Sequence, residues 1–223
     1  YYEHRNYLPI IGPVFAFSWL VWKASEKFKW LAPAVLGSYS ILLSWLLWQT
    51  TTLWGRPEIA IEIWGQTKPQ SIRAQQYLAN RYFLMKDIAT ARDLLEKTSA
   101  ANQNSIDITL QILFVDCGQN SSLKTEATLA KAREQSPSSD FSNAALTTIG
   151  EILRLHNQGL CPEISYLDLH RLTDGLLKNP HFPTSGRAGY SLHNLKADIF
   201  LSEGNFAQAL SHLDQAFKAN PEI

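Results

Sequence analysis

Residues 31–54, LAPAVLGSYSILLSWLLWQTTTLW, form a run of 24 residues without a charged side chain. An α-helix needs about 20 predominantly apolar residues to cross the hydrocarbon core of a bilayer. A helix this long in a water-soluble protein is normally amphipathic, with polar or charged residues on its outer face. Trp30 and Trp54 bracket the run, as tryptophans do at membrane–water interfaces. The run therefore predicts a transmembrane helix over residues 31–54.

A second uncharged segment, residues 8–22, precedes this run but has only 15 residues. As a helix it would reach about 22 Å, which is short of the roughly 30 Å of a bilayer core. Pro9, Gly12 and Pro13 fall in its first turns, where proline is tolerated best. We expect a short or tilted span over residues 8–22, with a re-entrant segment as the alternative.

The loop between the two segments, KASEKFK at residues 23–29, carries Lys23, Lys27 and Lys29 against one glutamate. Short lysine-rich loops are retained on the cytoplasmic side of a membrane. The two spans then form a transmembrane helical hairpin, and the residues before and after it lie on the opposite side. The predicted membrane part covers residues 1–54.

The composition changes after Trp54. All seven tryptophans lie within the first 64 residues, whereas 16 of the 20 basic and 18 of the 20 acidic side chains follow Trp54. The formal net charge of the whole chain is zero, so no global excess of positive charge indicates a nucleic acid partner. We expect a linker helix within residues 55–70 and a water-exposed helical domain over residues 71–223. The fold class predicted for the whole chain is therefore all-α.

Residues 191–221 fit the 34-residue tetratricopeptide (TPR) pattern, with Gly204-Asn205 as the turn between two helices. Residues 71–103 fit the same pattern in the same phase, although Thr98 and Gln103 depart from the alanine and proline expected. Small residues belong where two helix axes cross closely, and large residues fill the spaces between them. The predicted packing positions are Ala79, Tyr82, Ala91, Leu95, Ala197, Phe200, Ala209 and Leu213.

The region between these repeats fits the pattern only as helical pairs. Residues 105–135 read as one pair, and residues 139–157 with 163–178 read as another. The chain thus predicts four pairs in a TPR-like α-solenoid, which requires stacked repeats to bury a continuous core. A generic helical bundle is the alternative for the middle pairs.

The remaining candidate chemistry is sparse. The histidines lack HExxH or close Cys/His spacing, so they predict no metal site and are expected on the surface or in packing. Cys117 and Cys161 are expected as two buried free thiols, with a disulfide as the alternative in an oxidising compartment. Glu3, His4 and Arg5 lie just outside an apolar segment. They could bind a lipid phosphate or act as a base, or they could be solvated anchors of the span.

The order of these features resembles the C-terminal end of bacterial multi-spanning TPR membrane proteins related to the GT-C glycosyltransferases, and looks like the transmembrane-and-TPR O-mannosyltransferases. The segment EHRNYLP, a span, a lysine loop, a last span and TPR repeats carry the resemblance. An extracytoplasmic loop of that group matches at Glu3, Arg5, Tyr7, Leu8 and Pro9.

This resemblance implies a lipid-facing loop formed by Glu3, His4, Arg5 and Tyr7, a polyprenyl-phosphate sugar as donor, and a catalytic acidic residue upstream of this chain. It also implies a bacterial inner-membrane protein whose TPR domain lies in the periplasm and binds a protein partner or acceptor. No resident cofactor is evident from the residues themselves. The alternative is a non-catalytic TPR scaffold that docks onto a membrane protein complex.

Overall fold

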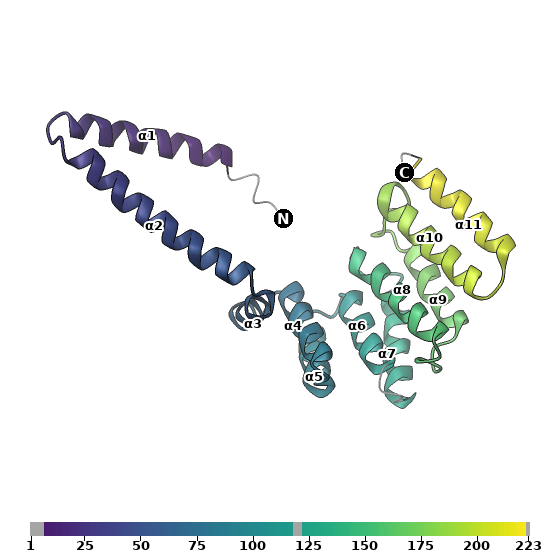
Figure 1. Ribbon diagram of the computed structural model, residues 1–223. Helices are drawn as coiled ribbons and strands as arrows, with labels where there is room; N and C mark the ends of the chain where they lie inside the picture. Colours follow the sequence, from purple (N-terminus) through teal and green to yellow (C-terminus); the bar gives the residue numbers. More distant parts are fainter. Residues whose placement is uncertain (1–6, 118–121, 222–223) are drawn as a thin grey trace. The chain divides into compact units, whose positions relative to one another are not determined.

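The computed structural model describes residues 7–117 and 122–221, which form eleven α-helices and no β-strand (Figure 1). This confirms the predicted all-α class. The helices are α1 (Tyr7–Ser25), α2 (Leu31–Trp54), α3 (Pro57–Thr67), α4 (Ile72–Leu84), α5 (Ile88–Ala101), α6 (Ile106–Cys117), α7 (Ser122–Gln135), α8 (Asn143–Asn157), α9 (Tyr166–Lys178), α10 (Gly186–Ser202) and α11 (Phe206–Ala219).

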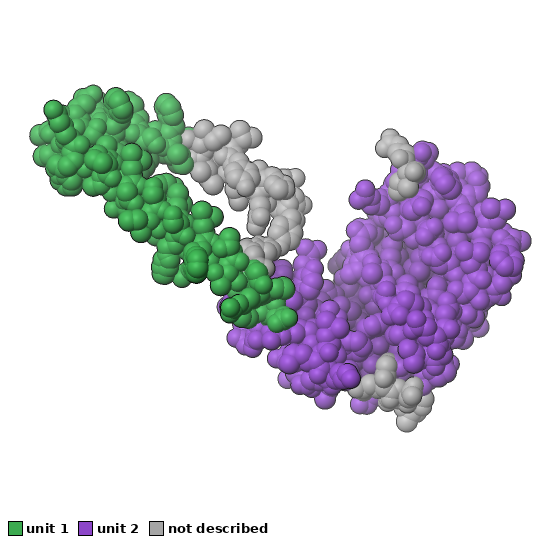
Figure 2. Space-filling view, viewed as in Figure 1, with its two compact units in different colours: residues 1–60 green, residues 61–223 purple. Residues whose placement is uncertain are grey.

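The chain divides into two compact units, residues 1–60 and residues 61–223 (Figure 2). In the first unit α2 coincides with the uncharged run. The turn at residues 26–30 connects α1 to α2, and the two helices pack against each other. Among the described residues one helix, Leu31–Leu53, is long and apolar enough to cross a membrane, and none of its most apolar 18-residue window is buried within the molecule.

The first helix differs from the expectation in one respect. It begins at Tyr7 and continues to Ser25, so Pro13 lies inside the helix and not in its first turn. A proline there has no N–H to donate, and one backbone hydrogen bond of the helix is lost. The apolar segment predicted as a short or tilted span, residues 8–22, lies within this longer helix.

In the second unit α4 packs on α5, α6 on α7 and α10 on α11, whereas α9 packs more closely on α10 than on α8 (Figure 1). Along the chain, α5 packs on α6, α6 on α8 and α8 on α10. The part of α3 in this unit packs on α4. The Cβ that an alanine would carry at Gly65 would lie 2.5 Å from a methyl carbon of Leu78, and Gln75 Nε2 donates to the Gly65 carbonyl at 2.8 Å.

The turn between α4 and α5 recurs 118 residues later between α10 and α11. Lys86 and Gly204 both adopt left-handed backbone conformations, with φ of 63° and 78°. Asp87 and Asn205 follow them, and each side chain accepts a hydrogen bond from the backbone N–H three residues further on. The backbone N–H groups of Asp87 and Asn205 also donate to the carbonyls five residues earlier, at 2.9 and 2.8 Å. The two pairs thus share one turn geometry.

The eight packing positions named from the sequence occupy equivalent places in these two pairs. Five of them are at most 2% exposed: Ala79, Ala91, Leu95, Ala197 and Ala209. The other three are partly exposed: Tyr82, Phe200 and Leu213. The four alanines and Leu95 are therefore buried where each pair packs, and the other three large side chains stay partly open to solvent.

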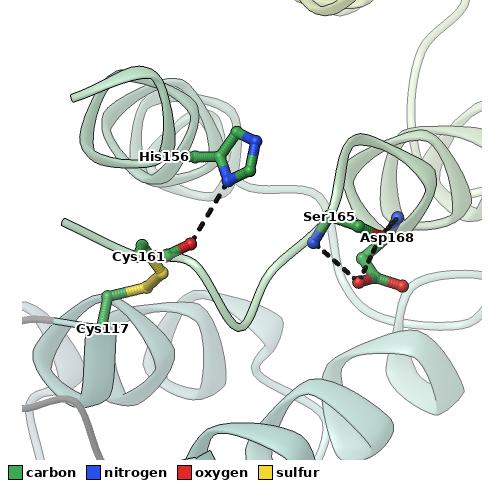
Figure 3. The surroundings of a disulfide bond; sticks show 5 residues. All are labelled: Cys117, His156, Cys161, Ser165 and Asp168. Carbon is green, nitrogen blue, oxygen red and sulfur yellow. Dashed lines mark hydrogen bonds between the residues drawn. A yellow bond between two sulfur atoms is a disulfide. The ribbon is translucent and has the colours of Figure 1, made fainter. Parts of the chain in front are cut away.

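Cys117 and Cys161 form a disulfide (Figure 3), which corrects the expectation of two free thiols. Cys117 is the last residue of α6, and Cys161 follows α8. Since α6 and α8 pack directly against each other, their C-terminal ends bring the two Cα atoms to 4.8 Å. The bond lies inside the larger of two hydrophobic cores, and His156 Nδ1 lies 3.2 Å from the Cys161 carbonyl oxygen. Because the two cysteines are 44 residues apart in the sequence, their spacing did not indicate that they lie this close together.

Candidate functional site

The lipid-facing loop inferred from the resemblance lies almost entirely outside the described residues. Glu3, His4 and Arg5 precede them, and Tyr7 is the first residue of α1. The role assigned to these four residues therefore stays a prediction. An apolar groove between α1 and α2 lies in the first unit, and the two candidate surfaces described next belong to the second.

The first of these surfaces is a groove of about 410 Å³ between α8 and α10. Leu153 and Leu201 contribute its apolar part, and Leu201 is 43% exposed. Arg154, Gln158 and Asp198 contribute exposed polar groups. An apolar strip beside groups of both charges is suited to binding a polypeptide segment, because main-chain and side-chain groups can both be paired there.

Hydrogen bonds fix the end of this groove. Asn157 Nδ2 donates to Ser202 Oγ at 2.9 Å, and the Tyr166 hydroxyl donates to Asn157 Oδ1 at 2.8 Å. Asn157 therefore ties α8 to α10 and, through Tyr166, to the start of α9. These bonds connect the helix ends that form the groove, so the groove is preformed in the free protein.

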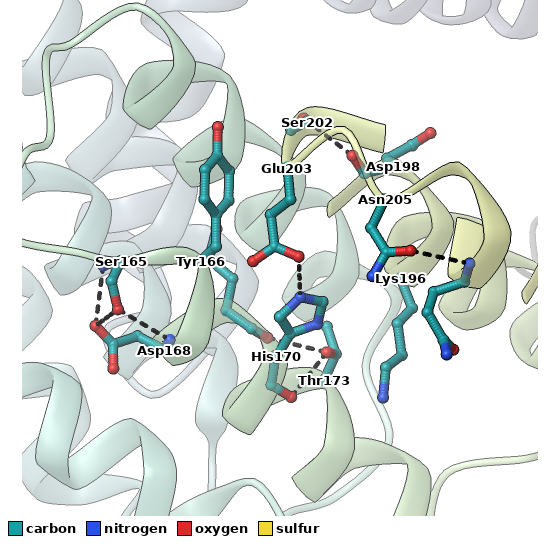
Figure 4. Close-up of polar contacts among 12 residues, drawn as sticks. Ser165, Tyr166, Asp168, His170, Thr173, Lys196, Asp198, Ser202, Glu203 and Asn205 are labelled. Atoms are coloured by element: carbon teal, nitrogen blue, oxygen red, sulfur yellow. Dashed lines mark hydrogen bonds and ion pairs between the residues drawn. The ribbon is translucent and has the colours of Figure 1, made fainter. Parts of the chain in front are cut away.

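Three histidines gather where α9, α10 and α11 meet. His170 Nε2 lies 2.9 Å from a Glu203 carboxylate oxygen (Figure 4), and the ring of Phe200 lies between those of His170 and His212, with centroids 4.3 and 5.5 Å away. His193 Nδ1 and His212 Nδ1 are 3.2 Å apart. Such a contact requires one of the two nitrogens to be unprotonated.

Burial and neighbouring charge disfavour protonation in this cluster. Burial lowers the pKa of His193. Burial first, and then the charges of Lys196, His193 and His170, lowers the pKa of His212 to about 4. Lys196 forms an ion pair with Asp174, although burial lowers the pKa of its ammonium group. The lowered pKa values favour neutral imidazoles at His193 and His212, beside the Lys196 cation. Among the described residues no group of three or more His, Cys, Asp or Glu side chains is placed to hold a metal ion.

A polar network pins α7 to the start of α9. Ser165 and Asp168 cap that helix reciprocally (Figures 3 and 4), and Arg133 of α7 forms an ion pair with the same carboxylate. Burial raises the pKa of Asp168, but hydrogen bonds from Ser165 and the charge of Arg133 outweigh it and lower the pKa overall. Because the Asp168 carboxylate accepts from both Ser165 and Arg133, this network has a structural role, although the buried Arg133 Nε has no partner among the described residues.

The second surface is a groove of about 500 Å³ between α5, α6 and α7, which the sequence had not indicated. Arg92 Nε donates to Asp116 Oδ1 at 2.6 Å, and Thr128 Oγ1 donates to Asp116 Oδ2 at 3.0 Å. Lys131 Nζ donates to Ser99 Oγ at 2.8 Å. The only sequence signal was the spacing of lysines along α7, and this signal does not reveal which helices lie opposite.

No family model matches the chain, and neither a curated protein nor a solved structure shows a significant match to it. The likeness to TPR proteins and to GT-C glycosyltransferases therefore rests on the sequence motifs alone.

Proposed function

We propose that this chain is part of a membrane-anchored TPR-type protein whose helical repeats bind a protein partner. The observation that carries the proposal is the recurrence of one helix-pair geometry 118 residues apart, with Lys86 and Gly204 at the same point of the turn. Repeats of this kind expose one long face of stacked helices, and such faces bind peptides or helices.

The anchor in this proposal is the hairpin of α1 and α2. The apolar side chains of α2 are exposed, which lipid would satisfy and water would not. The lysine loop at residues 23–29 would stay in the cytoplasm. The disulfide between Cys117 and Cys161 favours an oxidising compartment for the repeats, which in a bacterial cell is the periplasm.

The partner surface in this proposal is the groove between α8 and α10. Those two helices are first members of their pairs and pack directly on each other, as the helices lining the concave face of a solenoid do. Arg154 and Gln158 are exposed at the groove and bound only to groups on the same helix or its cap. They can exchange these bonds for a partner at little cost.

The resemblance adds a more specific version, in which the whole protein transfers a sugar from a polyprenyl-phosphate donor and Arg5 contacts the phosphate. A guanidinium binds phosphate through a planar fork that lysine does not reproduce. The competing version is a scaffold without activity. One experiment distinguishes them: measurement of protein-linked glycan in a deletion strain that expresses Arg5→Lys, Arg154→Glu or the control Lys178→Glu.

In the transferase version Arg5→Lys lowers glycan transfer at unchanged protein abundance, and Arg154→Glu lowers it through the acceptor. In the scaffold version Arg5→Lys has no effect, and Arg154→Glu alone disturbs the function of the partner complex. Lys178 is exposed on α9 outside both grooves, so its reversal controls for net charge. Full function of Arg154→Glu would contradict the role of the α8–α10 groove in both versions.

A further inference from the structure

The groove between α5, α6 and α7, called here the lysine groove, has an apolar floor and a cationic margin. Its floor includes Ala100, Ile112 and Ala127, and its margin includes Lys124 and Lys131, both on α7. It lies between the second helix of one pair and both helices of the next. It is therefore a different surface from the α8–α10 groove, and a ligand could bind here whether or not the α8–α10 groove binds a partner.

Lys124 and Lys131 are the cations of this groove that are available to pair with an anionic ligand. Arg92 also lines it, but its guanidinium is paired with the fully buried carboxylate of Asp116 and with Glu96. Hydrogen bonding to Asp116 accordingly raises the pKa of Arg92. Lys131 donates to the hydroxyl of Ser99, and neither Lys131 nor Lys124 forms an ion pair with any residue that the structure describes. Glu96 also lines the groove, but its carboxylate is paired with Arg92, so the two lysine ammonium groups are left without an acidic partner among the described residues.

The positions of these lysines limit what can bind. They are seven residues apart on α7, so they lie on one face of the helix about 10 Å apart along its axis. A peptide in the polyproline II conformation has three residues per turn and advances about 3.1 Å per residue, so acidic side chains three residues apart lie on one face about 9 Å apart.

A buried hydroxyl in the floor is a second, independent sign of a ligand. Thr109 lines the groove and is 0% exposed, yet its Oγ1 forms no hydrogen bond with any described residue. A threonine in a helix normally bonds back to a carbonyl of the preceding turn, as Thr128 does to Lys124 at 2.9 Å. A buried hydroxyl without a partner is unfavourable, and a polar main-chain group of a bound peptide would supply the missing partner.

We propose that the lysine groove binds an acidic peptide segment in the polyproline II conformation, with two carboxylate side chains three residues apart and small apolar residues between them. The carboxylates pair with Lys124 and Lys131, the apolar residues cover Ala127 and Ile112, and a main-chain group of the peptide bonds to Thr109.

The test uses the full chain in a non-ionic detergent and a fluorescein-labelled peptide with blocked ends that contains Glu-Ala-Ala-Glu. Fluorescence anisotropy gives its affinity and that of the matched Gln-Ala-Ala-Gln peptide. We expect the glutamate peptide to bind more tightly, and the double variant Lys124→Gln/Lys131→Gln to weaken it roughly tenfold, which is the effect of losing two exposed ion pairs. Lys178→Gln makes a charge change outside the groove and should leave the affinity unchanged.

Thr109→Val provides a readout that a loss of folding cannot imitate. It should weaken binding of the glutamate peptide while raising the unfolding temperature of the peptide-free protein, since an unpaired buried hydroxyl is replaced by a methyl group. Equal affinity for the two peptides would overturn the proposal, as would undiminished binding by the double variant. Lysine-dependent binding of phosphatidylglycerol in mixed micelles, without binding of the glutamate peptide, would assign the groove to lipid and overturn it too.

Discussion

At the scale of single residues, Lys86 carries a side chain in a backbone conformation that favours glycine. It adopts a left-handed conformation with φ of 63°, where Gly204 stands in the equivalent turn. This conformation costs a residue with a Cβ roughly 1–2 kcal/mol. We expect Lys86→Gly to raise the free energy of unfolding by about 1 kcal/mol, since the gain exceeds the entropy that glycine adds to the unfolded chain.

The matched change is Gly204→Ala, which should lower the free energy of unfolding by about 1–2 kcal/mol. A Cβ at Gly204 would meet no atom within 4 Å, so the effect reports the backbone conformation alone. Denaturant titration of both variants measures it. If both changes shifted stability in the same direction, the two turns would not be equivalent.

The histidine cluster of α9, α10 and α11 makes a second prediction at this scale. In the folded protein the pKa of His212 is about 4, against an ordinary value of 6.5, and the pKa of His193 is lowered as well. Between these values the unfolded chain binds more protons than the folded one, so the free energy of unfolding rises with pH. Acidification from pH 6.5 to pH 4 should therefore destabilise the repeat domain progressively.

The measurement is the unfolding temperature across that pH window for the unchanged chain and for His193→Gln/His212→Gln. The double variant should show a flatter dependence. Other titratable groups around the cluster are His170, Glu203, Lys196, Asp174 and Asp198. They remain in the variant, but the charges of His170 and Lys196 act on His212, so the difference between the two curves reports the cluster as a coupled unit. If the two curves of unfolding temperature against pH were parallel, the histidine cluster would not be the source of the pH dependence.

At the scale of elements, the crossing of α10 and α11 depends on a small side chain. Ala209 is 1% exposed at this crossing, and the equivalent Ala91 is fully buried between α4 and α5. Ala209→Trp should overpack the crossing and lower the free energy of unfolding by roughly 1–3 kcal/mol. Ala207→Trp is the control, because that position is exposed on the same helix. Equal unfolding temperatures for the two variants would contradict the assigned crossing.

Capping residues mark several helix starts in the structure. Ser71, Asp87 and Asn205 each accept a hydrogen bond from the first turn of the helix that follows. The repeat range predicted from residue 191 begins inside α10, which starts at Gly186. Glycines are poor helix formers, which hides such a start. Gly189 is needed there because a Cβ would lie 2.3 Å from the Thr184 carbonyl oxygen.

At the scale of the whole molecule, the proposed topology is tested by thiol labelling in intact cells with a permeabilised outer membrane. Both native cysteines are in the disulfide, so an introduced cysteine is the single reactive thiol of the described residues. A membrane-impermeant maleimide should label Ser138→Cys, an exposed position of the repeats, and should label Ser25→Cys only after lysis. Labelling of Ser25→Cys in intact cells would reverse the orientation.

The sequence by itself determined the features that depend on near neighbours in the chain. The uncharged run marked α2, the amphipathic pattern and its breaks marked most helices, and small residues at Ala79, Ala91, Ala197 and Ala209 marked the helix crossings. Local patterns carry this information because helix hydrogen bonds and side-chain faces repeat within a few residues.

Only the tertiary structure decided which distant residues meet. The disulfide of Cys117 with Cys161, the pairing of Arg92 with Asp116 and the approach of Lys131 to Ser99 join residues 44, 24 and 32 positions apart. Each depends on which helices stack, and that choice is made by the shape of whole packed surfaces. For this reason the lysine groove, with its unpaired cations and the unbonded Thr109, could be found only in the folded chain.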